Sequence, residues 1–113
     1  MTGQPDVRVA LAALEAVLAR RAAALIDEVA HYPTPIARCD EQLTKLIEQR
    51  TRAIAQLRAV RDLAAAAAYA APREWLERVG RWLEGYASTD DADEAASVAH
   101  ARSVASAAAE ARP

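Results

Sequence analysis

The sequence predicts an all-α protein folded as a helical bundle. Three glycines and five prolines among 113 residues are too few for the many turns of an all-β fold. No stretch alternates apolar and polar residues with the period of two that marks a half-buried strand. Alanine, the strongest helix former, supplies 31 residues. The length fits one domain, residues 1–113, with a single modest core.

Two long helices are predicted from the positions of the prolines. Residues 6–32 and residues 36–71 contain neither proline nor glycine, so each segment can form one uninterrupted helix. The short connection through Pro33 and Pro35 predicts that the two helices form a long antiparallel hairpin. Apolar residues of the first segment recur every three or four positions, as one buried stripe requires: Val7, Leu11, Leu14, Leu18, Ala22, Leu25 and Val29.

Residues 72–86 are predicted to form a third helix. Pro72 suits the first turn of a helix, where its missing N–H is not needed. Trp75 and Trp82 lie one heptad apart and give the segment an apolar face. Gly85 is a suitable residue to end the helix.

The remaining segment, residues 91–111, is rich in alanine. Asp91 followed by Glu94 resembles a capping box that would begin a fourth helix. Val98 and Val104 are its only bulky apolar side chains, so little apolar area is available to stabilise it. The sequence therefore leaves two possibilities for this segment, an alanine-faced helix in close contact with the others or a frayed tail.

Charge and composition narrow the classes of partner. A net charge of −2 gives the whole molecule no attraction for nucleic acid or for an anionic membrane. The apolar stretches are interrupted by charges and no signal-peptide pattern is present, which predicts a soluble cytoplasmic protein. The single cysteine, Cys39, forms no internal disulfide, and with only His31 near it in sequence it lacks a full set of zinc ligands. We expect a buried thiol, with no metal and no cofactor.

Long helices with few bulky side chains predict association with another chain. An apolar stripe that is only partly covered within one chain can be completed by a second copy or by a protein partner. The main functional hypothesis is therefore protein–protein interaction, as a structural subunit, adaptor or regulator. In a chain this poor in large side chains the tryptophans are the natural core residues, and the alternative is an exposed patch that anchors a partner. The candidate interface residues are Leu11, Leu14, Leu18, Leu25, Trp75 and Trp82.

The second predicted helix carries a cluster of arginines at positions 50, 52, 58 and 61. Glu48 with Arg52, and Arg58 with Asp62, have the i, i+4 spacing of surface ion pairs. Arg50 and Arg61 share a face close to the apolar stripe, where a guanidinium requires an anionic partner. That partner is either a carboxylate of a neighbouring helix or subunit, or a ligand in a cavity of the bundle.

Part of the sequence resembles the all-helical chorismate mutases and the related isochorismate pyruvate-lyases. The similarity lies in Asp40–Leu43, Leu46–Arg50, Arg61 and Pro72–Glu74. The resemblance implies an alternative function, an isomerase or lyase whose dicarboxylate pocket is lined by Arg50, Arg61, Arg73 and Glu74, with Glu110 near the ether oxygen. The sequence departs from the family pattern at Arg61, where the family has lysine, and at Pro33, where it has an arginine that reaches the partner subunit.

Overall fold

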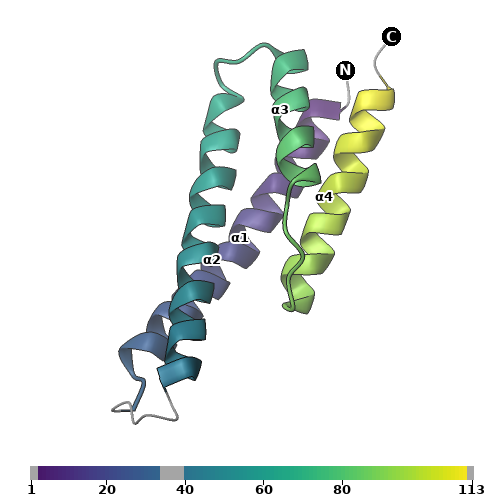
Figure 1. The fold of residues 1–113 in the computed structure, drawn as a ribbon. Coiled ribbons are helices and arrows are strands. Elements are labelled where there is room, and N and C mark those ends of the chain that lie inside the picture. The colour runs from purple at the N-terminus through teal and green to yellow at the C-terminus, as the bar shows by residue number, and fades with distance from the viewer. Residues whose placement is uncertain (1–2, 34–39, 112–113) are drawn as a thin grey trace.

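The computed structural model describes residues 3–33 and 40–111, and it confirms the predicted all-α fold. Figure 1 shows its four helices, and no strand is present in these two ranges. The helices are α1 (Gly3–Ala30), α2 (Asp40–Ala66), α3 (Pro72–Glu84) and α4 (Ala92–Glu110). The fourth segment is thus a helix and not a frayed tail.

The helices form an elongated bundle around α1, which packs against both α2 and α4 (Figure 1). The shorter α3 packs against α4 and contacts α2. The molecule measures 60 × 23 × 17 Å and has a radius of gyration of 16.5 Å. A compact domain of this length has a radius of gyration of about 13 Å. The difference reflects the length of α1 and α2, which the other two helices cover only in part.

Two of the helix boundaries that differ from the predicted segments have a clear physical reason. The first helix begins at Gly3, before Pro5, because proline is tolerated in a first turn whose N–H groups have no helical partner. The second helix ends at Ala66, five residues before the predicted end. There the indole N–H of Trp75 donates to the carbonyl of Leu63 at 2.6 Å. That carbonyl is one of the last four in α2, which lack partners within the helix. Residues 36–39 lie outside the described residues.

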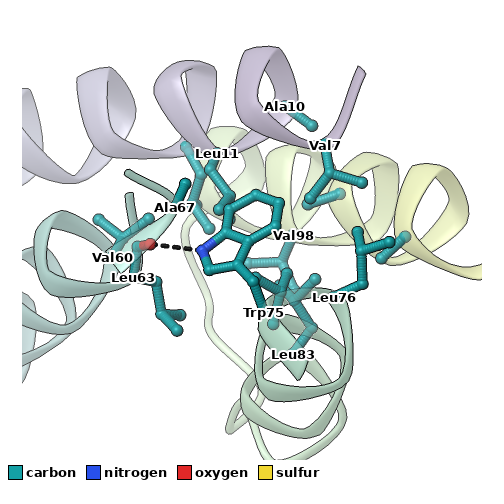
Figure 2. Close-up of a cluster of buried hydrophobic side chains, with 14 of the residues drawn as sticks. Val7, Ala10, Leu11, Val60, Leu63, Ala67, Trp75, Leu76, Leu83 and Val98 are labelled. Atoms are coloured by element: carbon teal, nitrogen blue, oxygen red, sulfur yellow. Dashed lines mark hydrogen bonds between the residues drawn. The ribbon is translucent and has the colours of Figure 1, made fainter. Parts of the chain in front are cut away.

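The main hydrophobic core surrounds Trp75, which is fully buried (Figure 2). All four helices contribute to this cluster, and its residues come from both halves of the chain. Its buried members besides the tryptophan include Leu11, Leu14, Leu18, Val60, Val79, Leu83 and Val98. Trp82 is only partly buried and packs edge-on against Tyr86, with 5.2 Å between the ring centroids. One of the two tryptophans is therefore the centre of the core, and the other lies at its margin.

The fourth helix packs closely because its buried face is made of alanine. Ala101, Ala105 and Ala108 are buried. A Cβ atom placed on Gly3 would lie only 2.6 Å from the Cβ of Ala108, so the start of α1 approaches α4 more closely than any other residue type allows. Small side chains on both helices thus replace the bulky residues that this segment lacks.

The ends of α1 and α2 that meet at the hairpin extend past α4 (Figure 1). Arg21 of α1 and Arg52 of α2 both contact Glu94 in the first turn of α4, which marks the level at which α4 begins. We call residues 21–33 and 40–52 the hairpin arm, and residues 3–20 and 53–111 the body. A small second hydrophobic cluster lies at the root of the arm, formed by Ala22, Leu25 and Ala53 with Leu46, Ile54 and Leu57 packed against them.

Candidate interaction site

The structure places the arginines of the predicted dicarboxylate pocket in separate surroundings. Nε of Arg61 lies 3.1 Å from Oε2 of Glu15, an ion pair that joins α2 to α1. Nε of Arg73 lies 3.5 Å from Oε1 of Glu77 on its own helix. Arg50 lines a surface hollow whose described lining includes neither of these arginines. Eleven residues of helix separate Arg50 from Arg61, which is about 16 Å along the axis.

The two acidic residues of the same hypothesis are exposed and do not meet these arginines in one described site. Glu74 lies in the first turn of α3, and Glu110 is the last residue of α4. The side chain of Asp40 lies outside the described residues. Within this chain the structure therefore does not assemble the pocket that the resemblance implies.

Five of the six candidate interface residues lie inside the chain, which corrects their assignment to a surface. Each of these five is almost fully buried, because the main core or the small cluster at the root of the arm encloses it: Leu11, Leu14, Leu18, Leu25 and Trp75. Trp82 alone retains partial exposure. A stripe with the correct period identified the buried face of α1, but the chain covers that face with its own helices.

A buried carboxylate connects the body to the base of the arm. The side chain of Glu94 is only 1% exposed. The Tyr86 hydroxyl donates to its Oε2 at 2.5 Å, and the Thr89 hydroxyl donates to its Oε1 at 3.0 Å. Nε of Arg21 lies 3.2 Å from Oε1, and Nη1 of Arg52 lies 3.5 Å from Oε2. This carboxylate thus joins α1, α2 and α4 with the connection that precedes α4.

The start of α4 shows why Glu94 does not complete the predicted capping box. Oδ1 of Asp91 accepts a hydrogen bond from the backbone N–H of Glu94 at 2.8 Å, as the capping pattern requires. The N–H of Asp91 donates to Oγ1 of Thr89 at 3.2 Å and not to the Glu94 carboxylate. The Thr89 hydroxyl thus accepts the hydrogen bond that the glutamate accepts in a capping box. The Glu94 side chain instead points inward toward the two arginines.

The Glu94 carboxylate is enclosed by its own hydrogen-bond donors and cations. Burial, and then the hydrogen bond to the Glu94 carboxylate, raises the pKa of the Tyr86 hydroxyl, so that hydroxyl remains a donor. The guanidinium carbon of Arg52 lies 5.7 Å from the centroid of the Tyr86 ring, within cation–π range. Nε of Arg21 is buried and close enough to Glu94 for an ion pair, but it is not aligned for a hydrogen bond, so its attraction to the carboxylate is mainly coulombic. We interpret the cluster as structural.

The open surface lies at the root of the arm instead. A hollow of about 340 Å³ is lined by Ile26 of α1 and by Arg50, Thr51, Ile54, Ala55 and Arg58 of α2. The Thr51 hydroxyl donates to the carbonyl of Ile47 at 3.0 Å, so it is already occupied. Arg50 and Arg58 form no ion pair or hydrogen bond with the described part of the chain. The hollow thus combines an apolar floor with two unpaired cations.

Exposed branched side chains continue this surface along the arm. Ile26 is 46% exposed and Ile47 is 37% exposed. The arm therefore presents apolar area that the described helices leave in contact with solvent.

Sequence reasoning missed the central role of Glu94 and the partner of Arg52. The i, i+4 spacing assigned Arg52 to Glu48, but the structure places it on Glu94, and its Nη2 also donates to the carbonyl of Ala87 at 3.1 Å. One signal was present, because Glu94 is an acidic residue four positions before Val98 on the apolar side of its helix. That position favours a buried carboxylate with cationic partners.

Comparisons with known proteins give no indication of the function. No protein family model, curated protein or solved structure matches the chain. In residues 3–33 and 40–111 no group of three histidine, cysteine or acidic side chains is arranged to hold a metal ion, and Cys39 lies outside these ranges. None of the helices in the same two ranges combines the length and apolar character that a bilayer crossing requires.

Proposed function

We propose that this protein acts through protein–protein interaction, as a structural subunit, adaptor or regulator, and that the hairpin arm carries the binding surface. The observation that supports this most directly is the apolar surface of the arm, where Ile26 and Ile47 remain exposed. Fully burying one isoleucine side chain is worth about 1.5–3 kcal/mol, so covering this surface favours a complex.

Several charged groups that could take part in catalysis are already paired within the chain, which supports an interaction role over an enzymatic one. The buried Glu94 is surrounded by its own partners, and Arg61 and Arg73 have carboxylates beside them. The hollow near Ile54 is one of the open surfaces of the described residues, and its lining is partly apolar. Such a surface suits the side chain of another protein, because buried apolar contacts supply most of the affinity at the centre of an interface.

Crosslinking from defined positions tests this proposal. A photoreactive benzophenone residue replaces Ile47 on the arm in one variant and the exposed Ser103 on α4 in the control variant. After irradiation in the cells that produce the protein, we expect discrete adducts from the variant at position 47 and none from the control. Adducts from position 103 alone would place the interaction on the body and contradict the proposal.

The same surface predicts self-association as one form of the interaction. Sedimentation equilibrium at micromolar concentration reports the number of chains directly. A mass above that of one chain, lost in an Ile47→Glu variant, identifies a second copy as the partner. A monomer at all concentrations contradicts self-association, and the partner is then a different protein.

A dicarboxylate-binding enzyme similar to the chorismate mutases is the second candidate. The unpaired Arg50 beside a hollow is the observation that favours it. On this hypothesis the purified protein converts chorismate to prephenate, or isochorismate to salicylate and pyruvate. Replacing Arg50 by alanine should then lower the rate about 10²–10³-fold, the usual loss when one charge-stabilising contact is removed. Absence of turnover with both substrates contradicts this candidate.

A further inference from the structure

The two unpaired arginines beside the hollow have a regular spacing. Arg50 and Arg58 are eight residues apart on α2, about 12 Å along the helix axis, with Ile54 midway between them. All three side chains line the same hollow, together with Ile26 from α1. The surface therefore presents a fixed pattern of cation, apolar side chain and cation.

Arg50 and Arg58 differ in their partners from the other two arginines of α2. Arg52 and Arg61 of the same helix have ion pairs with Glu94 and Glu15. Arg58 has the spacing to pair with Asp62 on its own helix, but the structure has no such ion pair. The two guanidinium groups next to the apolar floor are thus available to an outside anion, and each can hold a carboxylate by two parallel hydrogen bonds.

We propose that this hollow binds an acidic amphipathic helix of a partner protein. The partner helix carries two acidic residues seven or eight positions apart, which pair with Arg50 and Arg58. A bulky apolar residue midway between them enters the hollow and covers Ile54 and Ile26. This proposal rests on the proposed function and specifies the chemistry of the partner, because amphipathic helices bind grooves through side chains repeated at this spacing.

Charge and chemistry argue against a second copy of this chain and against a nucleic acid as the occupant of this hollow. In a symmetric antiparallel pairing of two copies centred on Ile54, Arg50 of one copy would face Arg58 of the other, and like charges repel. A nucleic acid would supply anions but would leave the floor formed by Ile26, Ile54 and Ala55 without an apolar contact. The net charge of −2 also gives no general attraction for phosphates.

The test measures the affinity of the full chain for designed helical peptides by fluorescence anisotropy. The probe is an alanine-based peptide with two glutamates seven residues apart and leucines midway between them. Its matched control has lysine at both glutamate positions. We expect the glutamate peptide to bind about tenfold more tightly than the lysine peptide, which corresponds to two partly exposed ion pairs.

Charge reversal in the protein gives the decisive comparison. The double variant R50E/R58E should reverse the preference and bind the lysine peptide more tightly. The double variant R20E/R78E removes two other exposed arginines with the same change of net charge, and it should keep the wild-type preference. Equal loss of binding in both double variants indicates a general charge effect and overturns the assignment.

Other outcomes separate this inference from the proposed function. If the wild-type protein shows no peptide preference while crosslinking from position 47 still yields adducts, the acidic-helix assignment fails and the interaction role stands. If neither experiment gives a signal, both fail. Tighter binding of a DNA duplex than of the glutamate peptide, lost in R50E/R58E, would assign the arginines to nucleic acid and contradict the inference.

Discussion

The body and the hairpin arm share two helices but are stabilised very differently. In the body, Leu18 of α1 is buried in a core to which four helices contribute, with Trp75 at its centre. Seven residues later on the same helix face, Leu25 is buried in a cluster made by α1 and α2 alone. The two leucines are almost equally inaccessible, at 0% and 4% exposure.

The comparison shows that burial of single residues does not measure the support around them. Leu18 belongs to a large cluster of buried residues from four helices, whereas Leu25 belongs to a small cluster against which partly buried residues such as Leu46 and Ile54 pack. A two-helix hairpin buries too little apolar area to be stable by itself, so the arm depends on the body and on any partner that covers it. The Glu94 cluster joins the two regions at their boundary.

The largest expected loss of stability is at the centre of the body. Replacing Trp75 by alanine should destabilise the protein by about 3–5 kcal/mol, because it leaves a cavity and removes the hydrogen bond to Leu63. Urea unfolding measures this change, and Trp82→Ala is the matched control. Replacing the half-buried Trp82 should lower the free energy of unfolding clearly less. Equal losses would place the two rings in equivalent surroundings and contradict the described core.

A matched pair of substitutions on α1 tests the comparison itself. Leucine to alanine in a core costs about 2–5 kcal/mol, and the cost depends on how far the site can collapse. We expect Leu18→Ala to fall near the upper end of this range, since four helices hold the cavity open. Leu25→Ala should fall near the lower end, because two helices can close around it. Chemical denaturation of both variants gives the two values, and a larger loss at position 25 would contradict the account.

The junction between the regions should be sensitive to the charge of Glu94. In Glu94→Gln the two arginines lose their buried anion, although an amide can still accept from the Tyr86 hydroxyl. We expect a loss of about 1–3 kcal/mol in the free energy of unfolding, the usual cost of leaving a buried polar group unsatisfied. Asp93→Asn is a suitable control, since Asp93 is exposed in the same turn. An unchanged stability of the glutamine variant would mean that the cluster contributes little.

The smallest effect is an expected gain in stability on α3. Gly80 lies in the interior of α3, and a Cβ atom added there meets no atom within 4 Å. Replacing it by alanine should therefore stabilise the protein by about 0.5–1 kcal/mol. Gly3→Ala should have the opposite effect, because its new Cβ would collide with Ala108. Thermal unfolding of both variants distinguishes the open glycine from the enclosed one.

The sequence predicted the fold class and the buried stripe of α1, because both follow from composition and local periodicity. It also predicted the beginning of α4 at Asp91, since a capping side chain acts within a single turn. It did not predict that Trp75 ends α2 by binding a carbonyl, or that Arg52 reaches Glu94. These contacts join residues far apart in the chain, so no local pattern determines them.

At the candidate site, too, local patterns were predicted from the sequence and contacts between distant residues were not. Periodicity placed Leu11, Leu14 and Leu18 on one face correctly, but it could not say whether a second chain or this chain covers that face. The hollow near Ile54 is formed by side chains of α1 and α2 together, which only the packed structure determines. The arginines of α2 were noticed in the sequence. Among the described residues, the structure gives carboxylate partners to Arg52 and Arg61 and no ion pair to Arg50 or Arg58.

Native-state hydrogen exchange on α1 tests the central claim most directly, because one continuous helix passes through both regions. In our account four helices stabilise the body, whereas only two helices stabilise the arm, and the surface of the arm remains open to a partner. Under conditions that favour the native state, we predict that amides of residues 22–30 open with a lower free energy than amides of residues 7–18. Equal opening free energies along the whole helix would show that the arm is as well supported as the body, and would contradict the account.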